Sequence, residues 1–196
     1  MEQNVQKCVV AYFKYLAKHN QLSKSVNESC TSTLNRTLAK CRHLALMKKA
    51  VQSVNEDENH LRKRLIYSLL LEINDLVCSV QKLTSTLEKS TGELRNKFNE
   101  FEQSVKDYDF PENSILTNGN SLQPSLSELL ELANDSWTYY EAYIGEIQIS
   151  LQIANLTKEA EIENILEILK RNLNDNDIDD FIAITQFCEQ VDVSTT

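Results

Sequence analysis

Apolar residues recur every seven positions along the middle of the chain. Six positions carry this repeat: Ile66, Ile73, Val80, Leu87, Leu94 and Phe101. Three leucines follow the first three of these by three residues: Leu69, Leu76 and Leu83. Apolar residues spaced alternately by three and four are typical of coiled-coil helices, whose apolar stripe packs against another helix. We therefore predict one long helix over residues 57–106, with Leu69, Leu76 and Leu83 as partner-binding positions.

The repeat weakens in the second half of this helix. After Leu87 the second set of positions becomes polar: Ser90, Lys97 and Ser104. Residues 90–93, Ser-Thr-Gly-Glu, resemble a capping box, which would mark a kink in the helix. The equally acceptable alternative is that Gly92 is an exposed residue inside an unbroken helix.

The first quarter of the chain shows helical spacing with less regularity. Its apolar positions are mostly three or four residues apart: Val9, Phe13, Leu16, Leu22, Val26, Cys30, Leu34, Leu38, Cys41 and Ala45. This series predicts a helix over residues 4–54, with an irregularity near residues 19–21. A turn is expected at residues 55–57, so that residues 1–106 form a long helical hairpin.

Residues 107–123 interrupt the helical pattern. Pro111, Asn118-Gly119 and several small polar residues give this segment a turn composition, and we predict an exposed connection. A third helix then starts at Pro124, where Ser125 and Glu128 form a capping box ahead of an apolar run. Its apolar positions alternate by four and three: Leu126, Leu130, Ala133, Trp137, Tyr140, Ile144, Ile147, Leu151 and Ala154. This series predicts a second heptad helix.

The third helix also carries a belt of aromatic residues. Four of them are candidate partner-binding residues: Trp137, Tyr139, Tyr140 and Tyr143. Aromatic residues at helical spacing usually belong to the core, and core packing is the interpretation that the pattern favours. Tyr139 lies off the apolar stripe, so it is placed to face a partner, where tyrosine and tryptophan are favoured anchors.

Two shorter amphipathic helices are expected at the acidic end of the chain. The first carries Ile162, Ile165, Leu166, Leu169 and Leu173, and the second carries Ile178, Phe181, Ile182, Ile184 and Phe187. Asp177 is a suitable helix cap between them, and the tail from Val191 is expected to fray. The patterns together predict an all-α fold. Long antiparallel coiled-coil helices would form an elongated bundle, and residues 124–190 would add the aromatic heptad helix and the two short acidic helices.

Composition and charge support few, long helices and limit the possible partners. Only 3 Gly and 2 Pro occur in 196 residues, which leaves few tight turns and excludes glycine-rich phosphate loops. Residues 1–109 carry 17 Lys and Arg against 13 Asp and Glu, whereas residues 110–196 carry 3 against 16. An acidic second half repels nucleic acid and suits a basic protein partner. A solvated acidic surface is an equally good interpretation.

The cysteines indicate a reducing compartment. They are odd in number and widely spaced: Cys8, Cys30, Cys41, Cys78 and Cys188. Without an apolar signal segment in the first residues, this pattern is typical of reduced thiols in a cytoplasmic or nuclear protein. No apolar run approaches the roughly 18 residues that a membrane span needs, so no membrane partner is expected.

No group of residues has the spacing of a catalytic or metal site. The histidines are isolated in the sequence, and no zinc spacing occurs. Residues 175–186 begin like a calcium loop, but Asp180 stands where glycine is needed and Gln186 where glutamate is needed. The basic runs at residues 48–49 and 62–64 lack interleaved aromatics, so direct nucleic-acid binding is not expected. We therefore expect a protein that is not an enzyme and holds no cofactor and no metal.

Two stretches of the chain share residues and spacing with one known family. In the first helix these are Val5-Gln6-Lys7, Leu22, Ser25, Cys30 and Leu34, and in the third they are Leu122-Gln123-Pro124-Ser125-Leu126, Leu130, Tyr140, Tyr143, Ile149 and Leu151. Through these residues the chain resembles the AIRIM family, small helical proteins that act with AAA+ ATPases in ribosome maturation. The chain departs from the family in lacking basic residues after its aromatic positions and in its acidic end, residues 174–192.

The resemblance implies a non-enzymatic adaptor subunit. Such proteins pair with a second small coiled-coil protein, similar to the cyclin-dependent-kinase-interacting protein. Together they associate with a hexameric AAA+ ATPase that strips maturation factors from the pre-ribosomal particle, which the adaptor meets indirectly. The alternative hypothesis is a structural coiled-coil subunit of another assembly, such as a kinetochore, tether or cytoskeletal complex. Both hypotheses need a partner, because a chain of this size has two heptad faces to cover.

Overall fold

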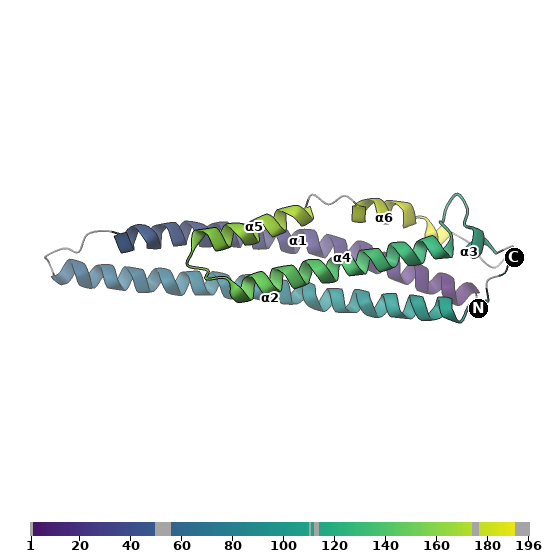
Figure 1. Ribbon diagram of the computed structural model, residues 1–196, viewed down its shortest axis with the longest axis horizontal. Coiled ribbons are helices and arrows are strands. Elements are labelled where there is room, and N and C mark those ends of the chain that lie inside the picture. The colour runs from purple at the N-terminus through teal and green to yellow at the C-terminus, as the bar shows by residue number, and fades with distance from the viewer. Residues whose placement is uncertain (1, 50–55, 110, 112–113, 174–176, 191–196) are drawn as a thin grey trace. The chain divides into compact units, whose positions relative to one another are not determined.

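A computed structural model describes residues 2–49, 56–109, 111, 114–173 and 177–190 (Figure 1). Its helices are α1 (Glu2–Lys49), α2 (Glu56–Lys106), α3 (Ile115–Asn118), α4 (Leu126–Ile153), α5 (Glu159–Leu173) and α6 (Asp177–Thr185), followed by the 3-10 turn η1 (Cys188–Gln190). The part of the chain so described contains no strand. The predicted fold class is therefore confirmed: an all-α bundle of long helices with short helices near the C-terminus.

Some predicted boundaries differ from the observed ones. Glu56, which the sequence assigns to a turn, is the first residue of α2, one residue before the predicted start of that helix. The predicted last residues of the first helix, 50–54, lie outside the described residues, as does the predicted frayed tail from residue 191.

The helices pack as two compact units, which are described separately. The first unit comprises Met1–Lys24, Leu87–Ile144 and Asn174–Thr196, and the second comprises Ser25–Thr86 and Gly145–Leu173. The helices α1, α2 and α4 each contribute residues to both units. Each unit therefore builds its own core from segments that are distant in the sequence.

The helices α1 and α2 run antiparallel within each unit. In the first unit, Tyr15 Oη on α1 donates to Glu93 Oε2 on α2 at 2.6 Å, and the earlier Tyr12 ring meets the later Phe98 ring of α2. In the second unit, Lys40 on α1 pairs with Glu72 on α2. Still later on α1, the carbonyl of Met47 is reached from α2 by Arg62, which precedes Glu72 in the sequence. Contacts move backward along α2 as they move forward along α1, which confirms the predicted antiparallel pairing.

The buried stripe of α2 continues into the second half of the helix. The predicted weakening of the heptad repeat is therefore a change of spacing and not a loss of burial. Leu87, Leu94 and Phe101 are buried as the repeat predicts. The residues buried beside them follow by four positions and not by three: Thr91, Phe98 and Val105. An α-helix accommodates either spacing because its 3.6 residues per turn lie between the two. Gly92 lies exposed inside unbroken α2, so the unbroken alternative is the one observed.

Polar residues occupy core positions of α1 in the first unit. His19, Asn20 and Ser23 are buried there, and α1 runs through residues 19–21 without the irregularity that the sequence predicts. His19 Nδ1 lies 2.8 Å from Ser90 Oγ, and Asn20 Oδ1 accepts a hydrogen bond from Tyr140 Oη at 2.9 Å. Buried polar groups persist when they are hydrogen-bonded. The gap in the apolar pattern therefore marks a buried polar cluster and not a helix break.

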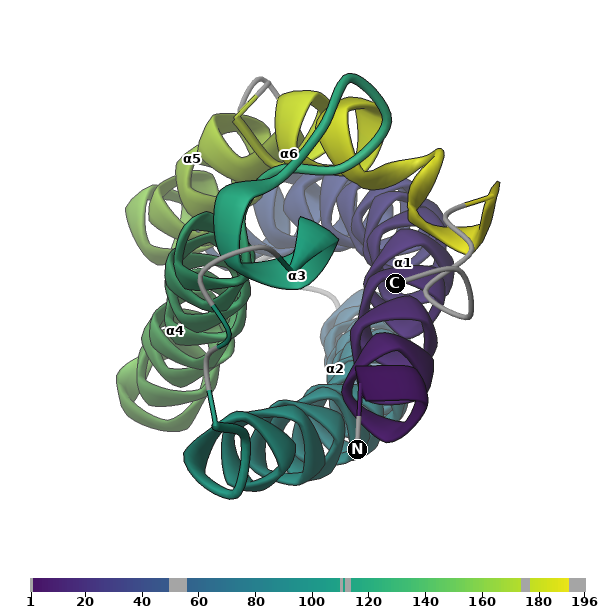
Figure 2. The same cartoon turned by 90° about the vertical axis from the view of Figure 1, so that its right-hand side faces the viewer.

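The segment between α2 and α4 is bonded to the first unit. Tyr108 Oη lies 2.6 Å from Glu2 Oε1 and 2.9 Å from Ser114 Oγ. Ser114 caps the short helix α3, whose Leu116 is fully buried. Figure 2 shows α3 at the end of the unit that carries the N-terminus, beside the first residues of α4.

The predicted capping box starts α4. Ser125 N donates to Glu128 Oε2 at 2.9 Å, and Glu128 N donates to Ser125 Oγ at 3.4 Å. This reciprocal pair satisfies two amide groups that the first turn of a helix otherwise leaves without partners. Hydrogen bonding by Ser125 lowers the pKa of the Glu128 carboxyl, so the charge that favours a helix N-terminus is retained.

The two short helices near the C-terminus belong to different units. α5 packs in the second unit, where Arg42 Nε on α1 donates to Glu159 Oε1 at 2.6 Å. α6 packs in the first unit, where Asp179 accepts a hydrogen bond from Lys24 Nζ at 2.7 Å and another from Asn20 Nδ2 at 2.7 Å. The acidic first turn of α6 is therefore held on α1 by a charged hydrogen bond.

Candidate partner-binding surface

Exposed apolar side chains gather near the end of the hairpin in the second unit. The group consists of Leu46 on α1 and of Leu61, Leu65, Tyr67, Leu70 and Leu71 on α2, which we call the hairpin-end surface. Leu61 and Tyr67 leave 58% and 65% of their surfaces exposed. Single exposed apolar residues are ordinary, but a group of them marks an interaction surface.

The lengths of α4 and α5 explain this exposure. Figure 1 shows that the end of α1 and the start of α2 extend past the nearest ends of these two helices. Farther along α2 in the same unit, Ile73 and Val80 are buried. The start of α2 is apolar around most of its circumference, a pattern that suits a helix covered on more than one side. Its neighbour α1 covers only part of it.

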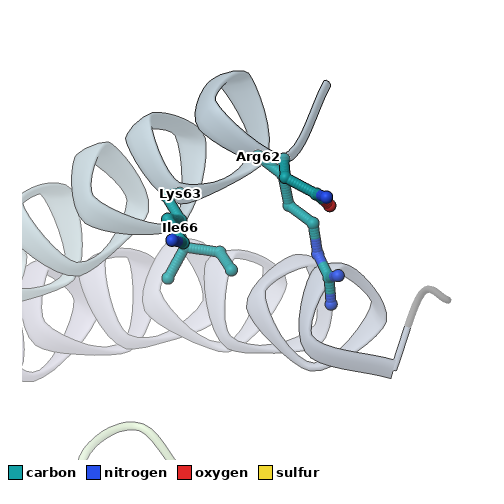
Figure 3. A pocket seen from close by; sticks show the side chains of 4 residues that line it. Arg62, Lys63 and Ile66 are labelled. Atoms are coloured by element: carbon teal, nitrogen blue, oxygen red, sulfur yellow. The ribbon is translucent and has the colours of Figure 1, made fainter. Parts of the chain in front are cut away.

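Arg62 ties the start of α2 to the end of α1. Its Nε donates to the carbonyl of Met47 at 2.8 Å, and its Nη2 donates to the carbonyl of Lys48 at 3.0 Å. These carbonyls lie in the last turn of α1, which has no intrahelical donors for them and where a cation is favourable. Figure 3 shows Arg62 reaching across to α1, near Ile66 and Lys63, which line a hollow of about 280 Å³.

The hairpin end is basic although the chain as a whole is acidic. Residues 36–49 and 56–75 together carry eight Lys and Arg against five Asp and Glu, whereas the complete sequence has a net charge of −9. Lys63 and Arg64 are exposed on α2 within one turn of Tyr67. Exposed cations beside apolar side chains favour a partner that is acidic as well as apolar.

The predicted partner-binding leucines of α2 differ in how much the chain itself covers them. All three lie in the second unit. Leu69 is buried, while Leu76 and Leu83 are half-buried. Leu69 therefore serves the core of its own unit, and the other two keep surface that a second protein can reach.

The predicted aromatic residues of α4 lie in the first unit. Tyr140 and Tyr143 are buried, while Trp137 and Tyr139 are half-buried. The rings of Tyr139 and Tyr143 stack with their centroids 6.4 Å apart, and the Arg95 guanidinium lies 5.2 Å from the centre of the Trp137 ring. Ring contacts therefore bring the three tyrosines together, whereas Trp137 lies against Phe98 and Arg95 of α2. The three leucines all lie in the second unit, and the four aromatic residues all lie in the first.

Tyr140 belongs to the buried polar cluster of the first unit. Its ring meets the His19 ring edge-on, with centroids 4.3 Å apart, and its hydroxyl donates to Asn20. Burial lowers the pKa of His19 to about 4, so the imidazole is neutral near pH 7. Helices that bury hydrogen-bonded side chains pair in one register, because any other register breaks those bonds. We therefore assign this cluster to the pairing of α1, α2 and α4.

The sequence patterns do not predict the hairpin-end surface. Its α2 residues lie off the heptad positions that mark the helix, so the heptad repeat does not include them. The sequence feature that indicates them is the number of large apolar residues. Residues 61–73 contain more of these than one helical neighbour can cover.

Within residues 2–49, 56–109, 111, 114–173 and 177–190, no group of three or more His, Cys, Asp or Glu is placed to hold a metal ion. Of the helices described above, none is both long enough and apolar enough to cross a membrane.

The sequence matches no protein-family model and no curated protein.

Proposed function

We propose that the chain is a non-enzymatic helical adaptor that associates with a hexameric AAA+ ATPase during maturation of ribosomal large subunits. It pairs with a second small coiled-coil protein, similar to the cyclin-dependent-kinase-interacting protein. The ATPase supplies the work that releases maturation factors, and the adaptor meets the pre-ribosomal particle indirectly. The proposed sites of action are the cytoplasm and the nucleus.

The hairpin-end surface is the observation that carries the binding part of this proposal. Covering apolar surface is worth about 25 cal/mol per Å² removed from water, so large side chains exposed together favour a bound partner. The half-buried positions of Leu76, Leu83, Trp137 and Tyr139 are further accessible candidates. The ATPase and the ribosomal substrate are supported by the sequence resemblance.

Affinity purification of the tagged chain from its own cells, followed by mass spectrometry, tests the proposal. We expect recovery of an AAA+ ATPase and of a second small helical protein. Depletion of the chain should lower the level of mature large subunits and leave maturation factors on pre-ribosomes. Recovery of partners without any AAA+ ATPase, together with normal large-subunit levels, would refute it.

The second candidate function is a structural coiled-coil subunit of a kinetochore, tether or cytoskeletal assembly. The lengths of α1 and α2, 48 and 51 residues, favour it, because long paired helices suit spacing as well as recruitment. In that case the purification recovers other coiled-coil proteins, and depletion disturbs their assembly while ribosome production stays normal.

A further inference from the structure

The start of α2 presents a second apolar stripe beside the one packed in its own unit. Tyr67, Leu70 and Leu71 are exposed and are spaced by three and four residues, so they share one side of the helix. The buried side is marked by Leu69 and Ile73 and points elsewhere around the helix. A helix with apolar residues on two sides is normally covered on both. The first turns of α2 therefore have room for one more helical neighbour.

Two cations flank this stripe. Lys63 precedes Tyr67 by four residues and Arg64 precedes it by three, so both share its side of the helix, and both are exposed. We call Lys63, Arg64, Tyr67, Leu70 and Leu71 the outer face of α2. A ligand that covers the apolar side chains of this face comes within reach of both cations.

Charge separates the possible occupants of the outer face. A second copy docked in parallel through the same face would set its own Lys63 and Arg64 against these residues, and like charges oppose that contact. A nucleic acid would meet the cations through its phosphates and would leave the three apolar side chains uncovered. An amphipathic helix with carboxylates beside its apolar stripe satisfies both the apolar and the charged parts.

We propose that the outer face of α2 binds an amphipathic helix of a partner protein that carries acidic residues along the edge of its apolar stripe. The apolar residues of that helix cover Tyr67, Leu70 and Leu71, and its carboxylates pair with Lys63 and Arg64. The inference rests on the proposed binding role and adds the chemical class of the partner. It does not require that the partner be the ATPase.

Two designed peptides test the inference on the full chain. Each is a helix of about three heptads with leucine at its core positions; one carries Glu at the flanking positions, and its twin carries Lys. Binding is measured by fluorescence anisotropy of the labelled peptide. The acidic peptide should bind at least about tenfold more tightly than its basic twin, with an affinity that falls as salt is added.

Matched variants assign the binding to one face. Tyr67→Ser with Leu71→Ser should weaken the acidic peptide by at least about tenfold, because truncating buried anchors is costly. Lys63→Glu with Arg64→Glu should reverse the preference between the two peptides. The control is Ile149→Ser with Ile153→Ser, which removes two exposed apolar side chains of α4 in the same unit and should leave the affinity within about twofold. Circular dichroism of each variant verifies folding.

Several outcomes would overturn the inference. Equal binding of both peptides, or unchanged binding by the Tyr67/Leu71 variant, would remove the outer face as the site. A wild-type dimer in sedimentation that dissociates in this variant would make a second copy the occupant. Tighter binding to phosphatidylserine vesicles than to the acidic peptide, with the same dependence on Tyr67 and Leu71, would make the ligand a lipid surface.

The adaptor proposal and this inference fail separately. In one outcome, the Tyr67/Leu71 variant recovers an AAA+ ATPase from cells and also binds the acidic peptide with unchanged affinity. In that case the adaptor role stands and the outer face is not its docking site. If the peptide assay succeeds and no ATPase is recovered, the docking site stands and the ATPase assignment falls.

Discussion

His19 occupies a core position of α1 where a coiled coil ordinarily holds an apolar side chain. It is 1% exposed, lies 2.8 Å from Ser90 Oγ and meets the Tyr140 ring. Burial lowers its pKa to about 4, against 6.5 for an unperturbed histidine. The unfolded chain therefore binds a proton between these two values that the folded chain excludes. This histidine supports folding above pH 6.5, and its contribution declines as the pH falls toward 4.

Replacing His19 should flatten the dependence of stability on pH. From pH 7 to pH 5 the wild-type histidine should cost about 2 kcal/mol of unfolding free energy, since one pKa unit corresponds to about 1.4 kcal/mol. His19→Gln should remove this part of the loss, although it lowers stability at pH 7. Urea denaturation at pH 7 and at pH 5 measures this change in unfolding free energy. His43→Gln, at an exposed position, is the control, and an unchanged slope in His19→Gln would contradict the expectation.

Replacement by alanine should have opposite effects on stability at two of the glycines. Gly92 lies exposed in the middle of α2, and an added Cβ meets nothing within 4 Å. Gly92→Ala should therefore stabilise the chain by roughly 0.5–1 kcal/mol, because glycine is a poor helix former. Gly119 has φ of 70°, and an added Cβ would lie 2.8 Å from Ser125 N, so Gly119→Ala should destabilise. Thermal denaturation distinguishes the two, and a loss of stability in both variants would argue against the unbroken helix at Gly92.

Helix α2 shows how a buried stripe can persist while its residue types change. Its first part follows the leucine repeat, with Leu69 and Ile73 buried. From Val80 onward, the second buried position is the fourth residue after each repeat position and not the third, beginning with Thr84. The position vacated by leucine is then half-buried, as at Lys97, while Phe98 takes its place in the core. The energetic weight of α2 should follow this observed burial and not the leucine repeat.

Alanine substitutions along α2 test that expectation. Leu94→Ala removes a fully buried side chain and should cost about 2–5 kcal/mol of unfolding free energy. Leu76→Ala removes a half-buried one from the same helix and should cost clearly less, because less apolar surface returns to water. Denaturant unfolding of the two variants gives the comparison. Equal losses would mean that the repeat, and not the burial, sets the energetics.

Helices and their pairing were open to prediction because they follow from spacing. The period of the apolar residues predicts α2 and α4, and Ser125 with Glu128 predicts the start of α4. The polar cluster at His19 was not predictable, because a buried polar residue and a helix break both interrupt an apolar series. The exposed apolar side of α2 was also not predicted. The heptad repeat identifies one apolar stripe and does not include further apolar residues such as Tyr67 and Leu71.

Charge is distributed differently in the two units of the molecule. In the first unit the acidic residues of the C-terminal segment are partly used inside the chain: Asp179 pairs with Lys24 and Glu189 pairs with Lys14. The second unit leaves Lys63 and Arg64 exposed at its hairpin end. The acidic half is therefore more than a solvated surface, and the place with most to gain from a new partner is basic and apolar.

Hydrogen exchange should reveal this difference in coverage. In the free chain, the amides of residues 61–71 should exchange faster than those of residues 91–105, because neighbouring helices cover less of the former. Saturation with the acidic peptide should slow exchange in residues 61–71 and leave residues 91–105 unchanged. The Tyr67→Ser, Leu71→Ser variant should show no such protection. Protection of residues 91–105 instead would place the peptide in the first unit.

The hydrogen bonds of Gln6 constrain the order of folding during translation. Its buried side-chain amide donates to Gln123 Oε1 at 2.6 Å and to the carbonyl of Cys188 at 2.6 Å, across 117 and 182 residues of sequence. A buried amide that lacks its partners costs roughly 1–3 kcal/mol. Helix α1 leaves the ribosome before Cys188 does, so the packing of α1 is complete only after translation passes residue 188. Until then the end of α1 around Gln6 lacks its contact with residue 188, and a nascent chain with incomplete packing is a client for chaperones.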